Sequence, residues 1–443
     1  MMKQENPWTD RFGPALTDVQ IRERVRVDAR PLEDLTKLPA EQAVTALGER
    51  LAQVFVPTAQ VVSVLAGFVG MARAYSTSAF PSMGHYVRQI YQAQSGEASR
   101  LPTCLTGLAG VGKSELLKAL AKVMPEDAEL CVPGHSGLRA TSLLSFVMQS
   151  QVGAPGVLRQ RTVQGWADLP RGGLNAHNIY RDGVSLMTAD EFQAVTAGGS
   201  ANAVATKTLL QMAQVGPPLV YCANYSLVHS LLKRPQQDRQ RLLSNSVIIH
   251  PEAPDSDDWR TTLAELSKVA PRVIRIDPER DAGDIHGYTA GIKRSVIALL
   301  STAYRLARAS GRDHFGMVEI QQAYASAEYW THRSDVEELT RQALGNSGRG
   351  RRAPLDLVCP FPGARLPQKV VVADKMIESY EDRLNEEHLR SSLTRDEREG
   401  LKARVVAPTA KKASASVTRL PRRGSRKDEL LAGQADFLSD LRR

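Results

Sequence analysis

The eight residues from Gly107 to Ser114 constrain this chain more than any other part of its sequence. They read Gly-Leu-Ala-Gly-Val-Gly-Lys-Ser, a full match to the phosphate-binding pattern G-x-x-x-x-G-K-[ST]. An apolar run at 103–106 precedes them, and a strongly helical run at 115–124 follows. Glycines let backbone N–H groups curl around a phosphate, and the N-terminus of the next helix adds the positive end of its dipole. The sequence therefore predicts a nucleotide-binding loop between a strand and a helix.

Each residue type in this loop has an expected contact with a nucleotide. Lys113 can reach the β- and γ-phosphate oxygens, and the hydroxyl of Ser114 can bind Mg²⁺. Together with backbone groups this predicts a cofactor-binding set for ATP and Mg²⁺ that consists of Gly107, Gly110, Val111, Gly112, Lys113, Ser114 and Glu115. The alternative is a glycine-rich turn that binds no nucleotide.

A pair of acids is expected to complete the phosphate site from a neighbouring strand. Asp190 and Glu191 come at the end of the apolar run that begins at Val184. Asp190 would hold the Mg²⁺ ion, directly or through water, and Glu191 would polarise the attacking water. The alternative is that both acids only stabilise the N-terminus of the helix that begins at Phe192, where negative charge is favourable.

Two polar residues are expected to sense the nucleotide. Asn224 follows the strand predicted at 219–223, where its amide can orient the lytic water or simply turn the chain. Arg294 opens the first long helix of a C-terminal helical region and can reach back to the nucleotide. Lys293 is the rival for this second role, and a solvated helix face is the simpler interpretation of both cations.

An arginine before the last predicted strand is a candidate for catalysis between subunits. Arg241, or Arg239 in its place, lies where an oligomeric ATPase presents an arginine to the γ-phosphate of its neighbour. The alternative is a surface arginine in a salt bridge with Asp238 or Glu252.

The middle of the chain predicts an α/β fold. Between residues 101 and 280, short apolar runs alternate with amphipathic helices, which is typical of a doubly wound unit with a mainly parallel sheet. An insertion at 150–182 interrupts this core, and a small helical lid is predicted at 281–344. The expected strands lie at 103–106, 129–132, 183–188, 219–223 and 247–250.

The two ends of the chain differ from this core. Residues 1–35 are polar and contain three prolines, so a flexible arm is expected. Residues 36–100 show the periodicity of three helices, with Thr58 as the N-cap of the second. Residues 345–443 predict a linker, a charged helix near 374–402 and a low-complexity basic tail that binds a partner.

Composition excludes several classes of protein. At 443 residues the chain is about three times the ~150 residues of a typical domain, so several domains are expected. Its 42% apolar and 24% charged residues exclude a wholly disordered, collagenous or membrane-embedded protein. The N-terminus has no apolar segment of a secretory signal, and four widely spaced cysteines favour a reducing compartment.

The charge is unevenly distributed. The chain has 57 Lys and Arg against 48 Asp and Glu, a net +9, and residues 401–443 alone hold eleven against four, a net +7. A basic tail on a balanced body suggests an anionic partner, most often nucleic acid, although a solvated tail gives the same pattern. Candidates for contact with the DNA backbone are four arginines of the insertion, Arg159, Arg161, Arg171 and Arg181.

The predicted site residues occur in an order that resembles the AAA+ ATPases. That family has a phosphate-binding loop, a pair of acids, a first sensor, an arginine finger, a second sensor and a helical lid. The matching residues here are Gly107–Ser114, Asp190-Glu191, Asn224, Arg241 and Arg294. Within AAA+, the runs at 190–193, 220–243 and 254–259 are similar to the TnsC branch of transposon-encoded regulators, related to TniB. The resemblance covers roughly residues 40–335.

This resemblance implies a function in transposition. ATP-bound subunits would assemble as rings or helical filaments on duplex DNA and link a TniQ-type target selector to the transposase. Hydrolysis of ATP would limit or disassemble this platform. It also implies a bacterial cytoplasmic protein associated with the nucleoid, with no membrane partner. Two alternatives stay open, a replication-type AAA+ loader or origin-binding switch, and a signalling or defence NTPase whose tail binds protein alone.

Overall fold

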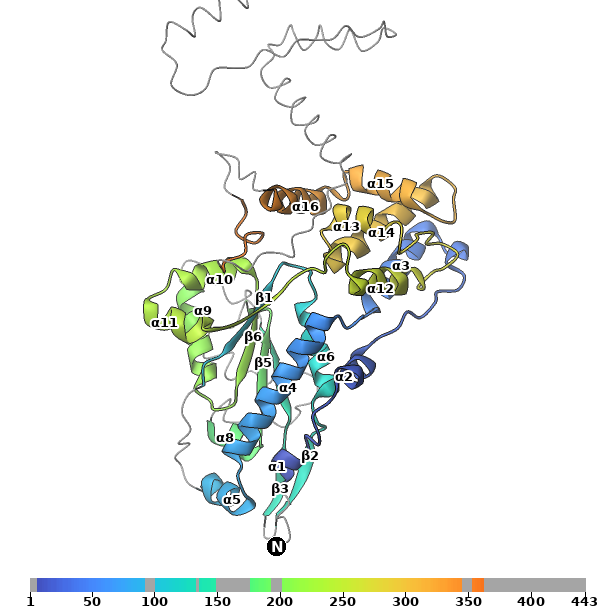
Figure 1. The fold of residues 1–443 in the computed structure, drawn as a ribbon. Helices are drawn as coiled ribbons and strands as arrows, with labels where there is room; N and C mark the ends of the chain where they lie inside the picture. Colours follow the sequence, from blue (N-terminus) through green and yellow to red (C-terminus); the bar gives the residue numbers. More distant parts are fainter. Residues whose placement is uncertain are drawn as a thin grey trace, which may run out of the picture. The chain divides into compact units, whose positions relative to one another are not determined.

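The structure is a computed structural model that describes residues 6–91, 100–132, 135–148, 176–192, 201–344 and 353–361 (Figure 1). All of these residues belong to one compact unit, Met1–Lys375. None of the helices in the described ranges is long and apolar enough to span a bilayer. The charged helix predicted near 374–402 and the basic tail lie outside the described residues, as does most of the insertion.

A five-stranded parallel sheet forms the centre of this unit. The strands run, from one edge to the other, in the order β4 (Leu143–Val147), β5 (Leu186–Asp190), β6 (Leu219–Ala223), β1 (Thr103–Gly107) and β7 (Asn245–Ile249). The predicted α/β class is therefore confirmed. The strand that leads into the phosphate-binding loop, β1, is separated by one strand, β6, from β5, the strand that ends in the acids.

One predicted strand lies outside this sheet. Residues 129–132 belong to β2 (Ala128–Val132), which pairs antiparallel with β3 (His135–Ala140) in a separate two-stranded sheet. The second parallel strand is β4 instead, and it buries Leu144 and Phe146 on one face. Both runs are short and apolar, so periodicity could not tell a hairpin strand from a sheet strand, and tertiary pairing decided between them.

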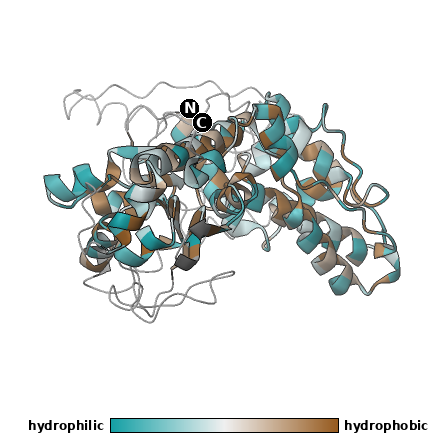
Figure 2. Cartoon of the chain, turned by 90° about the horizontal axis from the view of Figure 1, so that it is seen from below, coloured by the Kyte–Doolittle hydropathy of each residue, from teal (hydrophilic) through white to brown (hydrophobic). Residues whose placement is uncertain are grey.

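Helices cover both faces of the sheet (Figure 1). Three of them pack on the face that contains Leu105 and Val220, namely α2 (Asp18–Val25), α4 (Ala59–Ala79) and α6 (Lys113–Val123). Four pack on the face that contains Cys104 and Tyr221, namely α8 (Ala176–Arg181), α9 (Ala201–Ala213), α10 (Tyr225–Leu232) and α11 (Gln236–Leu243). Both hydrophobic and hydrophilic residues occur along most helices in Figure 2, as expected for helices that bury one side.

The segment expected to be a flexible arm is packed in the structure. The prolines do keep its helices short, since α1 (Pro7–Asp10) has four residues and α2 has eight. Trp8, Ile21 and Val25 are nevertheless fully buried. The average composition of this segment is polar, so it gave no sign that these few widely spaced apolar side chains are buried against the rest of the protein.

We expect Trp8 to be a major contributor to stability. Its ring lies 5.4 Å from that of Phe80 and 4.4 Å from that of Tyr86, measured between centroids. Trp8→Ala should lower the free energy of unfolding by about 3–5 kcal/mol, measured by urea denaturation and circular dichroism. Val19→Ala is the control, because Val19 is 61% exposed on α2 and its loss should change stability by less than about 0.5 kcal/mol. Equal midpoints for both variants would contradict the packed arrangement.

The three helices predicted for residues 36–100 are present as α3 (Ala40–Gln53), α4 and α5 (Met83–Tyr91), after a short 3₁₀ helix, η1 (Leu35–Lys37). Thr58 caps α4 as predicted, with its hydroxyl accepting a hydrogen bond from the backbone N–H of Val61 at 3.4 Å. These helices do not pack as one separate bundle. Helix α4 packs on α6 of the sheet layer, whereas α3 packs along a helix of the C-terminal region, so the connection between them crosses from one layer to the other.

The C-terminal part of the described chain is helical, as predicted for a lid. After α12 (Asp257–Ser267) it consists of α13 (Ala282–Thr289), α14 (Lys293–Ala309), α15 (Met317–Ala325) and α16 (Trp330–Ala343). Helix α14 is central, because it contacts α3, α13 and α15 (Figure 1). The first turn of this helix lies against the phosphate-binding loop, which brings the lid to the carboxyl edge of the sheet.

Candidate functional site

The loop between β1 and α6 is closely wrapped by its neighbours. Gly107 and Gly110 have φ angles of +158° and +82°. A Cβ atom on Gly107 would lie 2.4 Å from the carbonyl oxygen of Ile249, and one on Gly110 would lie 2.6 Å from Cβ of Arg294. Only glycine fits at either position, so the loop keeps the open backbone that a phosphate requires.

Lys113, the first residue of α6, lies across this loop. Its ammonium group donates hydrogen bonds to the carbonyl oxygens of Gly107 and Leu108, both at 2.9 Å. Burial lowers the pKa of Lys113, while the nearby negative charges of Asp190 and Glu191 act in the opposite direction. The structure therefore brings the predicted lysine and the predicted acids together.

The two acids follow β5 in an unusual backbone conformation. The backbone N–H of Glu191 donates to Oδ1 of Asp190 at 2.8 Å, and Glu191 has a φ angle of +54°. A residue with a side chain adopts this left-handed region at a cost of about 1–3 kcal/mol, and such strain is concentrated at functional sites. Glu191 is exposed at the strand end, and Asp190 is half-buried beside it. The helix that the two acids would alternatively begin lies largely outside the described residues.

Cys222 is a neighbour of this pair that sequence reasoning missed. It is 1% exposed on β6, the strand next to β5. Burial raises the pKa of its thiol, and the adjacent carboxylate of Asp190 raises it further. The thiol is therefore neutral and can donate a hydrogen bond to Asp190. Only the register of the two strands reveals this neighbour.

Asn224 lies directly after β6 and caps the following helix. Its Oδ1 atom accepts hydrogen bonds from the backbone N–H of Leu227 at 3.3 Å and from the hydroxyl of Ser226 at 3.1 Å. Asn224 is thus the N-cap of α10. Because Oδ1 accepts the capping hydrogen bonds, Nδ2 is the atom that can contact a phosphate or a water molecule. The sensor role stays a prediction.

The structure distinguishes the two cations at the start of α14. The backbone N–H of Arg294 donates to the carbonyl oxygen of Gly110 at 3.3 Å, and its positive charge lies close enough to lower the pKa of Lys113. Lys293 points elsewhere, since its ammonium group donates to the carbonyl oxygen of Val54 at 2.6 Å. Arg294 is thus the cation that the fold places beside the loop.

The candidate finger arginines lie on α11, the helix that precedes β7. Arg239 and Arg241 are exposed on α11, and neither forms an ion pair with another described residue. Asp238, the proposed partner in the salt-bridge alternative, is 3.6 Å from Arg234 instead. Among described residues, the cation that acts on the pKa of Lys113 is Arg294. Arg239 and Arg241 are therefore exposed cations outside the set of charges that acts on Lys113.

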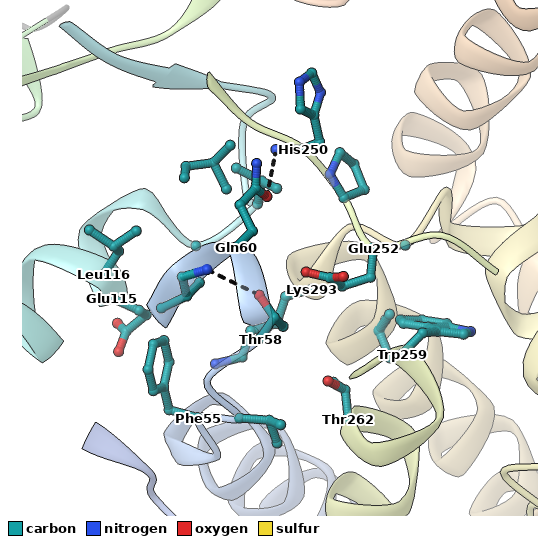
Figure 3. Close-up of a pocket in the computed structure, with 18 of the residues that line it drawn as sticks. Phe55, Thr58, Gln60, Glu115, Leu116, His250, Glu252, Trp259, Thr262 and Lys293 are labelled. Carbon is teal, nitrogen blue, oxygen red and sulfur yellow. Dashed lines mark hydrogen bonds between the residues drawn. The ribbon is translucent and has the colours of Figure 1, made fainter. Parts of the chain in front are cut away.

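A pocket that the sequence did not predict lies beside the loop (Figure 3). Three parts of the chain meet there: the connection between α3 and α4, the start of α6, and the segment from β7 to the lid. In Figure 3 the side chains of Phe55, Glu115, Lys293 and Trp259 surround it. Its volume is about 80 Å³ and its lining is mostly apolar. Such a cavity suits a flat, poorly charged group rather than a phosphate.

Polar groups fix two walls of this pocket. Gln60 holds β7 in place, since its Nε2 donates to the carbonyl oxygen of Ile248 at 3.0 Å and its Oε1 accepts from the backbone N–H of His250 at 3.2 Å. Burial lowers the pKa of Lys293, and the carboxylate of Glu115 opposes this effect. No local sequence signal marks these residues, because they meet only when the N-terminal helices fold back onto the loop.

The insertion contributes little to the described structure. Arg159, Arg161 and Arg171 lie outside the described residues. Arg181 ends α8, and its Nε donates to the carboxylate of Asp182 at 2.9 Å. The charge of this arginine is therefore partly compensated within the chain.

Comparisons with known proteins show distant structural similarity. No family model matches the sequence, and no curated protein matches it. The ORC1 protein of Aeropyrum pernix in complex with DNA aligns at 14% identity over 63% of this chain and 73% of that chain, with a TM-score of 0.35. The ADP form of ORC2 from the same organism aligns at 16% identity over 65% and 75%, with a TM-score of 0.37. A variant of RuvB from Thermotoga maritima aligns at 10% identity over 63% and 77%, with a TM-score of 0.31.

Proposed function

We propose that this chain binds and hydrolyses ATP at the loop between β1 and α6. The observation that carries this proposal is the convergence of separate segments on one point. The charges of Asp190 and Glu191 act on the pKa of Lys113, and the backbone N–H of Arg294 at the start of α14 donates a hydrogen bond to Gly110 of the loop. Side chains of opposite charge at the N-terminus of a helix fit a polyphosphate and the metal ion that accompanies it.

The loop and its neighbours fit ATP with magnesium. The phosphates would lie beside the N-terminus of α6, where Lys113 supplies a positive charge. The hydroxyl of Ser114 and the carboxylate of Asp190 would hold the Mg²⁺ ion, because hydroxyl and carboxylate oxygens are the ligands that this ion prefers. Magnesium would neutralise charge on the phosphates when bound.

Three further residues would have roles on the γ-phosphate side. Glu191 is exposed at the strand end and would orient and polarise the attacking water. The Nδ2 atom of Asn224 would donate to that water or to the γ-phosphate. Arg294, which lies on the loop, would contact the phosphates and thereby couple their binding to the position of the lid.

The pocket beside the loop is the proposed position of the adenine base. It touches Gly112 and Glu115 at the start of α6, so a base there would continue directly from phosphates held by the loop. Its walls come from both layers of the protein, because Val54 and Lys293 belong to the α3–α14 side and Gln60 to the sheet side. A bound base would therefore fix the lid relative to the sheet.

At the level of the cell, we propose a regulator of transposition that assembles on duplex DNA. Support comes from the run at 220–243, which resembles the TnsC branch and forms β6, α10 and α11. This run contains both Asn224, which directly follows β6, and Arg241, which is exposed on α11. A second subunit would be needed to bring an arginine to the γ-phosphate, so ATP hydrolysis would depend on assembly. The proposed partners are a TniQ-type target selector and a transposase.

Glu191→Gln separates assembly from hydrolysis and tests this proposal. The amide cannot act as a base, so we expect turnover of ATP to fall about 10²–10⁴-fold while nucleotide binding persists. Mass photometry and negative-stain imaging should then show large regular assemblies with duplex DNA and ATP, and none with ADP. Glu126→Gln is the matched control, since this acid is exposed and follows the end of α6 that is opposite the loop.

The outcomes of this experiment distinguish the functional alternatives. Assemblies that form with ATP regardless of DNA would favour the signalling or defence NTPase and contradict DNA-dependent assembly. DNA-bound assemblies that recruit a replicative helicase instead of a transposase in a pull-down would favour the loader. An active Glu191→Gln protein would refute the role of this carboxylate.

A further inference from the structure

We propose that residues 353–361 form a strap that positions the phosphate-binding loop against the lid and thereby controls how long nucleotide stays bound. This inference rests on the proposed nucleotide site. The strap follows the lid in the sequence and returns to α10 of the sheet layer, which no pattern in the sequence predicted (Figure 1).

Leu357 is the centre of the strap. It is 8% exposed and belongs to one buried apolar cluster with Leu108, Tyr225, Ile292 and Leu339. Each of these residues comes from a different part of the proposed site: the loop, the helix after Asn224, the segment before Arg294, and α16 of the lid. A single cluster therefore connects the phosphate-binding loop, α10, the segment before Arg294 and α16.

Further contacts hold the strap on both sides of Leu357. The backbone N–H of Leu357 donates to the carbonyl oxygen of Pro354 at 3.0 Å, which closes a turn. Beyond it, the carbonyl oxygen of Val358 is 2.9 Å from Nε2 of His229 on α10. Phe361 packs against the apolar cluster on the α9–α11 face of the sheet. The strap is thus tied to the sheet layer independently of the lid.

The packing of Leu357 links the strap to nucleotide exchange. Ile292 and Leu339 belong to the lid side of the cluster, and Leu108 and Tyr225 to the sheet side. If the lid moves away from the loop to release nucleotide, the cluster divides and apolar surface enters water, which is unfavourable. By linkage, a nucleotide that binds better to the closed arrangement favours packing of the strap by the same factor.

Two leucines of the strap give a matched test. Leu357 is buried in the cluster, whereas Leu355 is 48% exposed two residues earlier. In stopped-flow measurements with a fluorescent ATP analogue on the full chain, Leu357→Ala should release nucleotide about 5–50-fold faster, the range of a typical coupling between sites. Leu355→Ala should stay within about two-fold of the original chain. Leu357→Met should restore slow release, because Met fills a similar volume.

A second measurement reports on the strap itself. Cys359 is half-buried in the strap, beside Tyr225. Its alkylation by iodoacetamide, followed by peptide mass spectrometry, should slow several-fold when the ATP analogue is bound. Leu357→Ala should remove this protection. Cys104 is buried in the sheet and serves as an internal reference for the integrity of the fold.

The results separate failure of the strap from failure of the nucleotide site. If the original chain does not bind the ATP analogue, the proposed function is wrong and the strap loses its role with it. If the chain binds the analogue but Leu357→Ala and Leu355→Ala release it at equal rates, the strap alone is refuted. Should Leu357→Ala not fold, His229→Ala removes the tie to Val358 instead, and unchanged release in that variant would equally refute the strap.

Discussion

Arg241→Ala should reduce ATP hydrolysis by the assembled protein about 10³-fold or more and leave nucleotide affinity unchanged. The reason is that Arg241 is exposed on α11 and does not contribute to the charge around Lys113 of its own subunit. We therefore expect Arg241 to act on the γ-phosphate in the site of a neighbouring subunit. Steady-state hydrolysis with duplex DNA, together with a binding titration, measures both quantities.

Mixing two inactive variants provides a decisive control. An Arg241→Ala subunit retains an intact site, and a Glu191→Gln subunit retains an intact arginine. Mixed assemblies should recover part of the activity, because some Glu191→Gln subunits present Arg241 to intact sites. No recovery on mixing would contradict action between subunits. Arg239→Ala is the companion variant, and loss of activity there with full activity in Arg241→Ala would transfer the role to Arg239.

Lys113→Ala should weaken nucleotide binding by at least about 100-fold. The ammonium group is the positive charge held over the loop, and it would exchange its bonds to the carbonyl oxygens of Gly107 and Leu108 for bonds to phosphate oxygens. Charge-assisted hydrogen bonds in a partly buried site are worth more than neutral ones, so their loss is costly. Titration with a fluorescent ATP analogue measures the affinity.

Lys118→Ala is the matched control for this variant. Lys118 lies on the same helix, its side chain is 72% exposed, and it forms a surface ion pair with Glu115 at 2.9 Å. Exposed pairs of this kind contribute little, so affinity should stay within about three-fold of the original value. Unchanged affinity in Lys113→Ala would refute the assignment of the phosphate-binding loop.

Local sequence patterns predicted where helices and strands lie better than they predicted which other elements these helices and strands pack against. The strands at 103–106 and 219–223 and the cap at Thr58 are where the sequence placed them, because each depends on a few adjacent residues. The strand at 129–132 was correctly located but joins a hairpin rather than the sheet. The arm at 1–35 was misjudged, because burial of Trp8 depends on aromatic partners, such as Phe80, that are distant in the sequence.

The sequence by itself determined the chemistry of the central loop and the α/β class. A phosphate-binding loop is contiguous, and its glycines, lysine and hydroxyl act through neighbouring backbone groups, so spacing alone defines it. Tertiary structure alone decided which of Lys293 and Arg294 faces the loop, because adjacent residues on a helix point in different directions and only packing selects one. The pocket beside the loop and the strap around Leu357 also required the folded chain, since both are built from segments that are distant in sequence and meet through burial of apolar surface.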